Sequence, residues 1–199
     1  MIDFKNINKS EPYREFVRLY DKALASDQES IEAFCISSFN KKKDEVDSRF
    51  VNLKYILDDE WIFFSNYNSK KAEDFGSYDQ IAAIFYWNKI NVQIRIKGTV
   101  FKTSTSFSDQ HFKQRSQKKN ALAISSNQSK QIDDYKNVKR NFEKVYKDKS
   151  KLDKRPNFWG GYSFKPISFE FWQGHDSRLN KRTLFILEKN KWVISFLQP

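Results

Sequence analysis

The segment from Asn91 to Lys102 constrains the fold most strongly, because its apolar and polar side chains alternate. Branched apolar residues occupy positions 92, 94 and 96, and the positions between them are polar. Side chains of a β-strand point alternately to opposite faces, so the pattern predicts a strand with one buried face. Shorter segments rich in β-branched and aromatic residues predict further strands at residues 33–38, 48–55, 60–65, 81–87, 168–172, 183–188 and 192–197.

Four further segments have the periodicity and capping residues of helices. Pro12 suits the first turn of the first helix. Ser69 and Ser108 are suited to cap the second and third, because a serine hydroxyl can accept a hydrogen bond from a free backbone N–H. The fourth is basic and is predicted to direct Tyr135 inward. These helices are predicted over residues 11–25, 69–75, 108–123 and 132–147.

The elements follow the order helix, strands, inserted helices and strands again. Residues 156–161 are predicted to form an aromatic loop, and the turn 189–191 joins the last two strands in a hairpin. This order favours a mainly β, antiparallel barrel with flanking helices over a parallel βαβ sheet. No linker or internal repeat divides the chain, so residues 1–199 are expected to form a single domain.

Composition excludes several classes of protein. Apolar residues make up 39% and aromatic residues 17% of the 199 residues, which excludes a disordered chain. No apolar run reaches the roughly 20 residues that span a bilayer, and residues 1–10 lack the apolar core of a secretory signal. The single cysteine, Cys35, excludes an internal disulfide framework and a multi-cysteine metal site. We therefore expect a soluble, cytoplasmic protein with no bound metal and no membrane partner.

A net charge of +11, from 36 Lys and Arg against 25 Asp and Glu, favours an anionic partner. Nucleic acid and a phosphorylated small ligand are both compatible with this charge, and so is a lysine-rich surface without a specific ligand. The sequence contains no helix-turn-helix, zinc-finger or ribonucleoprotein signature, so no nucleic-acid partner is expected.

The predicted strand that contains Arg49 and Lys54 carries two cations five residues apart. Side chains alternate along a regular strand, so an odd spacing directs them to opposite faces. Either the two cations serve different anions or the strand contains a bulge. An edge strand with two surface cations is equally compatible with the sequence.

The predicted helix start at Ser69 is followed directly by Lys70 and Lys71. Free backbone N–H groups and the positive end of the helix dipole would lie beside two lysines, which suits a terminal phosphate. A capped helix with ordinary surface lysines is the alternative.

His111, Arg115 and Lys119 are spaced four residues apart and are predicted to line one face of a helix. They form either a second phosphate site or a solvated basic face. The amide of Gln93 both donates and accepts hydrogen bonds, so it can either read the edge of a heterocyclic ring or pair within the barrel.

Aromatic residues, glycines and arginines are interleaved near the C-terminus, in segments 158–162, 169–174 and 178–182. This combination suits a planar, anionic ligand that approaches the backbone closely. Core packing explains Phe169 and Phe171 instead.

Taken in order, these segments resemble the pyridoxamine 5′-phosphate oxidase family of FMN-dependent enzymes, from about residue 11 to residue 199. The resemblance implies an antiparallel split β-barrel homodimer that binds FMN in clefts built from both subunits. Its most specific parts are the Arg49–Lys54 strand, Ser69-Lys70-Lys71-Ala72, Trp159-Gly160-Gly161, Phe169-Glu170-Phe171-Trp172-Gln173-Gly174 and the pair Arg178 and Arg182.

The resemblance also implies which residues bind the cofactor. Arg49, Lys70 and Lys71 would hold the flavin phosphate, and Gln93 would face the isoalloxazine edge. The complete implied set is Arg49, Phe50, Val51, Asn52, Leu53, Lys54, Phe64, Ser65, Lys70, Lys71, Gln93, Gln128, Ser129, Trp172 and Arg182.

On the substrate side, the resemblance implies that Arg178 covers the pyridine ring of a phosphorylated B6 vitamer and is the catalytic residue. His111 stands where the family has Tyr, Lys119 where it has Ser, and Asn180 where it has His. The first two changes keep a site compatible with phosphate, and the third removes a titratable group. Because the chain begins close to the first predicted helix, we also expect most of the family's N-terminal segment, which helps to cover the substrate, to be missing. The implied substrate contacts are Lys54, His111, Arg115, Lys119, Arg178 and Asn180.

The implied function is oxidation of pyridoxamine 5′-phosphate to pyridoxal 5′-phosphate, with oxygen as acceptor and release of hydrogen peroxide. Pyridoxine 5′-phosphate is a candidate second substrate. One alternative is a flavoprotein of the same family that acts on another substrate or as a flavin reductase. The other is a basic nucleic-acid-binding protein without catalytic activity.

Overall fold

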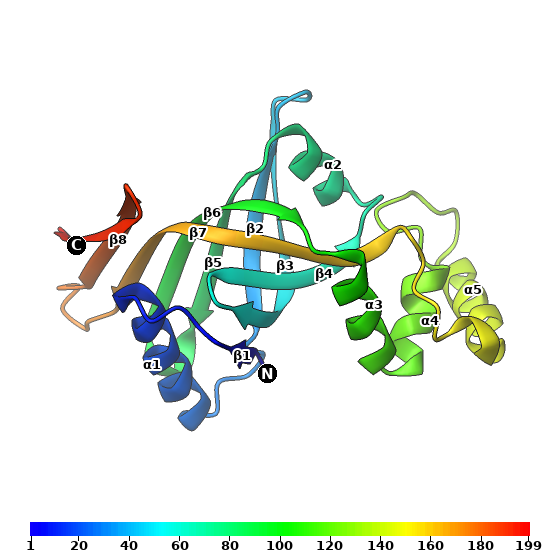
Figure 1. Ribbon diagram of the computed structural model, residues 1–199, viewed down its shortest axis with the longest axis horizontal. Helices are drawn as coiled ribbons and strands as arrows, with labels where there is room; N and C mark the ends of the chain where they lie inside the picture. Colours follow the sequence, from blue (N-terminus) through cyan, green and yellow to red (C-terminus); the bar gives the residue numbers. More distant parts are fainter.

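The structure is a computed structural model that describes residues 1–199. A curved sheet forms the centre, with helices at its ends and margins (Figure 1). Its elements are β1 (Asp3–Lys5), α1 (Glu11–Ala25), β2 (Ala33–Asn40), β3 (Glu45–Leu57), β4 (Glu60–Asn66), α2 (Lys70–Ser77), β5 (Gln80–Trp87), η1 (Asn88–Ile90), β6 (Val92–Lys102), α3 (Thr105–Gln114), α4 (Gln117–Ser125), α5 (Tyr135–Lys147), η2 (Lys149–Lys151), β7 (Trp159–Gln173), β8 (Lys181–Glu188) and β9 (Lys191–Leu197).

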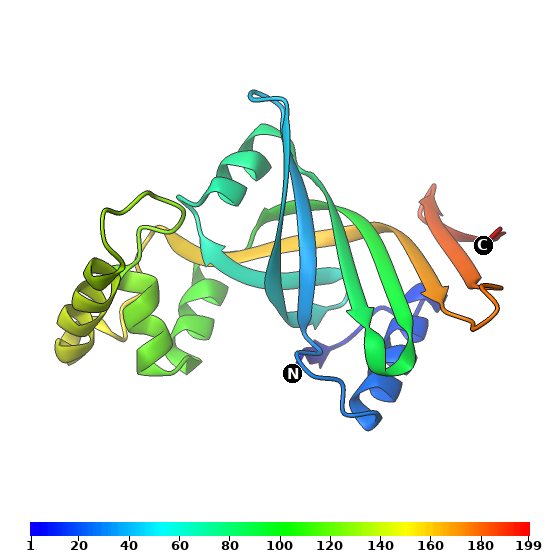
Figure 2. The same cartoon turned by 180° about the vertical axis from the view of Figure 1, so that it is seen from behind.

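Strand β4 closes the sheet into a ring. The other strands follow the order β1-β3-β2-β5-β6-β7-β8-β9, and β4 pairs with both β3 and β7. Strands β3, β2, β5, β6, β7 and β4 therefore form a closed circuit of paired strands, whose curvature is visible in Figure 2. Every pairing is antiparallel except that of β1 with β3. The expected class, mainly antiparallel β with flanking helices, is confirmed.

Aromatic side chains form the core and hold α1 against the sheet. The ring of Phe16 lies 4.5 Å from that of Trp61 and 5.5 Å from that of Phe85, measured between ring centroids. All three side chains are completely buried, and so are Phe169 and Phe171, as the sequence predicted. Each large apolar side chain of this kind contributes about 2–3 kcal/mol on burial. The core therefore fixes the curvature of the strands that carry the functional residues.

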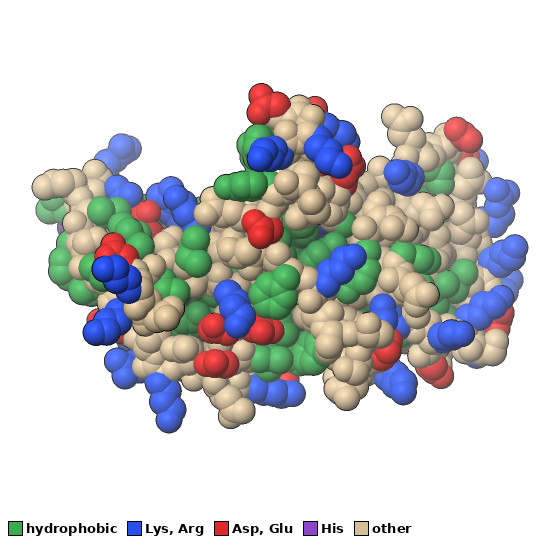
Figure 3. All heavy atoms as spheres, turned by 45° about the horizontal axis from the view of Figure 1, so that its top comes forward, with side chains coloured by type: hydrophobic (Ala, Val, Ile, Leu, Met, Phe, Trp, Pro, Cys, Tyr) green, Lys and Arg blue, Asp and Glu red, His purple; other side chains and the backbone are tan.

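Helices α3, α4 and α5 form a lobe at the end of the sheet opposite the β8–β9 hairpin (Figure 1). A small second core of Phe112, Ala123 and Trp159 attaches the lobe to β7. Helix α5 packs against α4 and buries none of its residues completely. Tyr135 is 69% exposed, so its predicted inward orientation is wrong. Lysine and arginine side chains are prominent at this end of the molecule (Figure 3).

The predicted helix 108–123 is two helices in the structure. Arg115 has an extended backbone, with φ −77° and ψ 153°, and separates α3 from α4. Ser104 rather than Ser108 caps α3, since its hydroxyl accepts a hydrogen bond from the N–H of Phe107. Ser108 lies one turn further along, where its buried hydroxyl accepts a hydrogen bond from the N–H of Gly161. The prediction of one continuous basic face is therefore wrong.

Other element boundaries in the structure also differ from the predicted ones. Residues 159–161 are not a loop but the start of β7, because Trp159, Gly160 and Gly161 pair with residues 64–66 of β4. Helix α2 continues beyond Gly76 to Ser77. The short strand β1 was not predicted. No helix combines the length and apolarity required to cross a bilayer.

Candidate functional site

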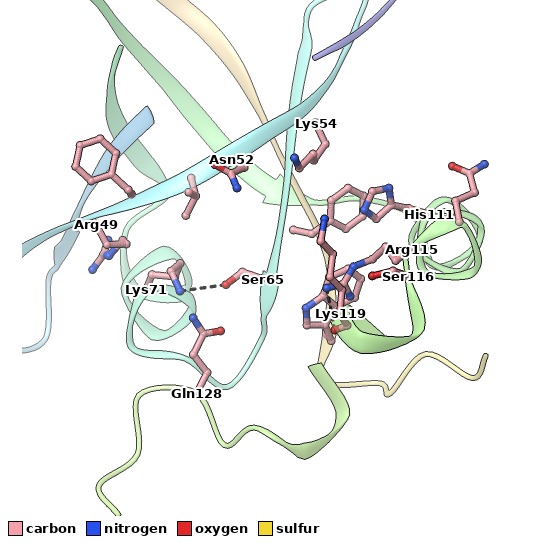
Figure 4. A pocket seen from close by; sticks show the side chains of 15 residues that line it. Arg49, Asn52, Lys54, Ser65, Lys71, His111, Arg115, Ser116, Lys119 and Gln128 are labelled. Atoms are coloured by element: carbon pink, nitrogen blue, oxygen red, sulfur yellow. Dashed lines mark hydrogen bonds between the residues drawn. The ribbon is translucent and has the colours of Figure 1, made fainter. Parts of the chain in front are cut away.

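A cavity of about 660 Å³ lies between β3 and β4 on one side and the helical lobe on the other (Figure 4). Five of the residues that line it are lysines or arginines, and none is acidic. Such an excess of positive charge in a concave site favours an anionic ligand. The lining residues are Arg49, Phe50, Val51, Asn52, Lys54, Phe64, Ser65, Lys71, His111, Gln114, Arg115, Ser116, Lys119, Gln128 and Trp159.

Arg49 and Lys54 of β3 line the same cavity, and the strand is irregular beside Lys54. The pairing of β3 with β4 shifts register between Leu53 and Tyr55. A bulge of this kind interrupts the alternation of side chains, so residues at an odd spacing can share a face. Of the alternatives that the sequence left open, the structure shows the bulge.

Lys71 is the most buried cation of the cavity, with 5% of its surface exposed. Its Nζ donates hydrogen bonds to Oγ of Ser65 (3.0 Å) and Oγ of Ser69 (3.3 Å). Burial, with a smaller effect from the nearby charge of Arg49, lowers the pKa of Lys71 to about 8. Ser69 precedes α2 as predicted, but its hydroxyl donates to the carbonyl of Asn66 instead of capping the helix. The first-turn N–H groups of α2 are therefore not capped by this hydroxyl, and they and the third N–H of the Lys71 ammonium can face an anion.

Asp74 orients the guanidinium of Arg49 from behind the cavity wall. The Asp74 carboxylate is 1% exposed and lies 3.3 Å from Nη2 of Arg49. It also accepts hydrogen bonds from the buried side chains of Ser38 (2.7 Å) and Asn40 (3.0 Å). Nη1 of Arg49 donates to the same Ser38 hydroxyl at 2.6 Å. The network joins β2, β3 and α2, so it fixes both a cation and the edge of the cavity.

Replacing Asp74 by alanine is expected to lower the free energy of unfolding by about 3 kcal/mol, because it leaves buried donors and a cation without their acceptor. Urea unfolding at pH 7 measures this value. Asp47→Ala is the matched control, since Asp47 also pairs with Arg49, at 2.9 Å, but is 38% exposed. That exposed pair should contribute less than about 1 kcal/mol. Equal losses in the two variants would contradict the assigned role of Asp74.

The opposite wall of the cavity is aromatic. The ring of His111 stacks on Phe64 with centroids 3.6 Å apart and planes inclined by 10°. The guanidinium of Arg115 lies over Trp159, 4.1 Å from the ring centroid. Although the helix is broken between them, His111, Arg115 and Lys119 all line the cavity. Figure 4 shows them across the cavity from Arg49 and Lys71, so the cations form two separate groups.

Burial alters the charge state of this second group. Desolvation, with smaller effects from Arg115, Lys54 and Lys119, lowers the pKa of His111 to about 4, so the imidazole is neutral at pH 7. Desolvation also lowers the pKa of Arg115 to about 10, which still leaves the guanidinium charged. Nη1 of Arg115 is buried and has no hydrogen-bond partner. A buried cationic donor without an acceptor is satisfied when an anion enters the cavity.

Several residues that the sequence assigned to the site lie outside this cavity. Lys70 is directed to Asp47 (3.4 Å), and the side chain of Leu53 is buried in the core. Ser129 is exposed beside Gln128, with a positive φ of 69°. Arg178 and Asn180 belong to the loop between β7 and β8, where Arg178 is exposed and has a φ of 60°.

Gln93, Trp172 and Arg182 form a separate row across the sheet. Gln93 of β6 pairs with Trp172 of β7, which pairs with Arg182 of β8. Directly paired residues of neighbouring strands project to the same face. Glu170 holds Arg182 in place, since its carboxylate accepts from Nε at 2.9 Å and lies 2.8 Å from Nη2. None of the three residues of the row lines the cavity.

The glycines of β7 serve internal packing, contrary to the interpretation that they admit a ligand. A Cβ atom on Gly160 would lie 2.2 Å from Oη of Tyr67, and one on Gly161 would lie 2.5 Å from Oγ1 of Thr103. Both positions are therefore filled by the protein itself.

Three features of the candidate site were not predicted from the sequence. Gln114 and Ser116 line the cavity, but polar residues at a helix break give no distinctive signal. Asp74 contacts Ser38, Asn40 and Arg49, which lie far from it in the sequence, so no local spacing indicated its role. Tyr55, whose hydroxyl lies 2.8 Å from Nδ1 of His111, depends on a contact between residues far apart in the sequence.

The donor set fits an aromatic phosphate ester. Arg49 and Lys71 offer charged donors for one phosphate, and Lys54, Arg115 and Lys119 for another anionic group. Phe64 and Trp159 provide an apolar wall for a planar ring. No three His, Cys, Asp or Glu side chains are grouped so that they could hold a metal ion.

Two protein-family models match this chain. Residues 20–148 match the model described as pyridoxamine 5′-phosphate oxidase, and residues 159–199 match the pyridoxine 5′-phosphate oxidase C-terminal dimerisation region. Proteins named pyridoxine/pyridoxamine 5′-phosphate oxidase are similar over most of the sequence. The one from Trichormus variabilis is 33% identical and covers 96% of this chain and 89% of its own, and the one from Leptospira interrogans is 32% identical and covers 88% and 82%.

Solved structures show the same fold. PhzG from Burkholderia lata, in complex with tetrahydrophenazine-1-carboxylic acid, superposes with a TM-score of 0.90 at 24% identity, covering 96% of this chain and 93% of its own. A pyridoxamine 5′-phosphate oxidase-related, FMN binding protein from Nostoc punctiforme gives a TM-score of 0.77 at 12% identity, covering 96% and 99%. At these identities, the two structures establish the fold only.

Proposed function

The chain belongs to the pyridoxamine 5′-phosphate oxidase family, and on this basis we propose that it is an FMN-dependent oxidase that converts pyridoxamine 5′-phosphate to pyridoxal 5′-phosphate. The observation that carries the proposal is the convergence of five cations, with no acidic residue, on one cavity with an aromatic wall. Two groups of cations match the two phosphate groups of FMN and a phosphorylated B6 vitamer. Pyridoxine 5′-phosphate is the candidate second substrate.

Arg49 and Lys71 are proposed to bind the flavin phosphate, because both are held in place from behind, by Asp74 and by Ser65. Lys54, His111, Arg115 and Lys119 are proposed to bind the phosphate of the substrate. FMN held there would supply a hydride acceptor for the C4′ carbon of the substrate, and its reoxidation would reduce oxygen to hydrogen peroxide. Water would hydrolyse the resulting imine to the aldehyde and ammonia. The side chains of the cavity neutralise charge and align the two reactants, and none acts as a strong general base.

The remaining assigned residues require a second subunit. Gln93, Trp172 and Arg182 lie on a face of the sheet outside the cavity, and the last two belong to the segment that matches the dimerisation region. We infer that a two-fold dimer brings this row and Arg178 of one subunit to the cavity of the other. Gln93 would then face the isoalloxazine edge and Arg178 the pyridine ring. The proposed assembly is therefore a homodimer whose FMN sites are shared between the two subunits.

The test is a visible spectrum of the purified protein, followed by measurement of peroxide released with pyridoxamine 5′-phosphate. We expect a yellow protein with flavin absorption and substrate-dependent peroxide. A yellow protein that releases no peroxide would favour another substrate or a flavin reductase. The departures from the family pattern at His111, Lys119 and Asn180 would then account for the different activity. A colourless protein that does not bind added FMN would contradict the proposal and would favour the nucleic-acid alternative.

A further inference from the structure

Tyr55 and His111 form a hydrogen-bonded pair at the edge of the cavity. Oη of Tyr55 lies 2.8 Å from Nδ1 of His111, and the two rings meet edge to face at 83° with centroids 5.4 Å apart. A face of the imidazole stacks on Phe64. The ring is therefore held in one orientation, and Nε2 makes no hydrogen bond within the chain.

A neutral imidazole carries one proton, so the partner of Nδ1 decides which nitrogen is the donor. The hydroxyl of Tyr55 has two acceptors within reach, Nδ1 of His111 at 2.8 Å and Oε1 of Gln114 at 3.4 Å. Donation to Gln114 would use the longer contact and would leave the proton of His111 on Nδ1. Donation to Nδ1 uses the shorter contact and places that proton on Nε2.

We propose that Tyr55 donates its hydroxyl proton to Nδ1 of His111 and thereby holds His111 as the neutral Nε2–H tautomer, an uncharged hydrogen-bond donor for an anionic group in the cavity. Tyr55 is then a positioning residue that acts through His111. This role rests on the proposed function, since it assumes that the cavity receives a phosphate group.

The surroundings of the pair favour a neutral ring. Arg115, Lys54 and Lys119 disfavour a proton on both ring nitrogens, and burial in the aromatic wall acts in the same direction. With the opposite tautomer, the lone pair of Nε2 would face the cavity and repel an incoming anion. The Nε2–H tautomer instead adds a hydrogen bond to the anion without adding a further charge beside three cations.

The tautomer can be measured directly, because the chain contains only two histidines, His111 and His175. Purified, FMN-loaded protein labelled with ¹⁵N-histidine should give two sets of ring signals by NMR, and His175→Gln assigns them. We expect Nδ1 of His111 to be unprotonated and Nε2 to be protonated from pH 6 to pH 9. A proton on Nδ1 would overturn the proposal. If the protein does not take up FMN, the same measurement on the protein as purified tests the tautomer independently.

The variant Tyr55→Phe keeps the aromatic contacts and removes the donor. Its His111 signals should move toward a mixture of tautomers, and KM for pyridoxamine 5′-phosphate should rise about three- to tenfold with little change in kcat, which corresponds to the loss of one neutral hydrogen bond. Tyr78→Phe, which removes an exposed hydroxyl hydrogen-bonded to Gln80, is the control and should change neither quantity. Unchanged His111 signals in Tyr55→Phe would overturn the proposal.

Titration with inorganic phosphate tests the role of the donor. In the wild-type protein, phosphate should shift the Nε2 signal of His111, and the shift should require a several-fold higher phosphate concentration in Tyr55→Phe. A wild-type protein with the expected tautomer but no response to phosphate would overturn the anion-binding role. Failure of the proposed oxidase activity would appear separately, as absence of substrate-dependent peroxide.

Discussion

Replacing Lys71 by methionine is expected to weaken FMN binding by about 10- to 100-fold, because it removes a charged donor from the proposed phosphate site. The same change should raise the free energy of unfolding of the cofactor-free protein. Lys71 is 5% exposed, and its ammonium has no carboxylate within ion-pair distance. The protein therefore retains a buried charge that destabilises the fold until an anion is bound.

The pH dependence of stability gives a separate signature of Lys71. Its pKa is about 8 in the folded protein, whereas a lysine in an unfolded chain titrates near 10.4. Below pH 8 the group is charged in both states, and the burial penalty is complete. Between pH 8 and about 10.4 the unfolded chain binds more protons, so the contribution of Lys71 to the free energy of unfolding rises with pH, by up to about 3 kcal/mol. Methionine at this position should remove that rise.

Two titrations measure these effects. FMN binding is followed by quenching of flavin fluorescence, and cofactor-free stability by urea unfolding from pH 7 to pH 10. Lys22→Met, at an exposed position in the last turn of α1, is the matched control and should change neither affinity nor the pH profile. A Lys71→Met protein that binds FMN as tightly as the wild type would remove Lys71 from the phosphate site.

Replacing Arg178 by alanine is expected to lower kcat by about 100-fold while leaving the flavin content intact, because Arg178 is proposed to position the substrate ring and not the cofactor. The side chain is exposed in the loop after β7 and has no acidic partner in the chain, so it is available to a neighbouring subunit. Peroxide release gives kcat, and the ratio of visible to ultraviolet absorption gives flavin content. Loss of flavin in this variant would contradict the assignment.

Mixing the two variants tests whether the site is shared. If the cavity of one subunit uses Arg178 of the other, a heterodimer of Lys71→Met and Arg178→Ala contains one intact site and one doubly altered site. Random exchange in an equal mixture should then restore about a quarter of wild-type activity, since half of the dimers are heterodimers. No recovery, with subunit exchange demonstrated by mass spectrometry, would place Arg178 and Lys71 in the same subunit's site.

Local patterns predicted the elements of this fold well, because strands and amphipathic helices depend on side-chain periodicity. The alternation in residues 91–102 identified β6 to within one residue. The register of β3 could not be obtained in this way. Its irregularity between Leu53 and Tyr55 appears in the pairing with β4, and the pattern within one strand does not specify that pairing.

The candidate site was predicted only in part, because local patterns identify single residues but not the tertiary contacts that bring them together. Lys71 and Arg115 were identified by charge and spacing, and both line the cavity. The helix predicted through Arg115 is broken there, and the cavity gathers the flanking residues through tertiary packing rather than along a helix face. The separation of Gln93 from the cavity was also not predictable, because strand order is a property of the whole sheet.

The helical lobe makes the charge distribution of the molecule asymmetric. Residues 113–155 contain 14 lysines and arginines against five acidic residues, whereas the rest of the chain has 22 against 20. A diffusing phosphate ester would encounter an attractive potential beside the mouth of the cavity before touching any side chain. Since such fields extend about 8 Å at physiological ionic strength, the capture rate of anionic substrates should fall steeply as salt is added, even where turnover at saturation does not.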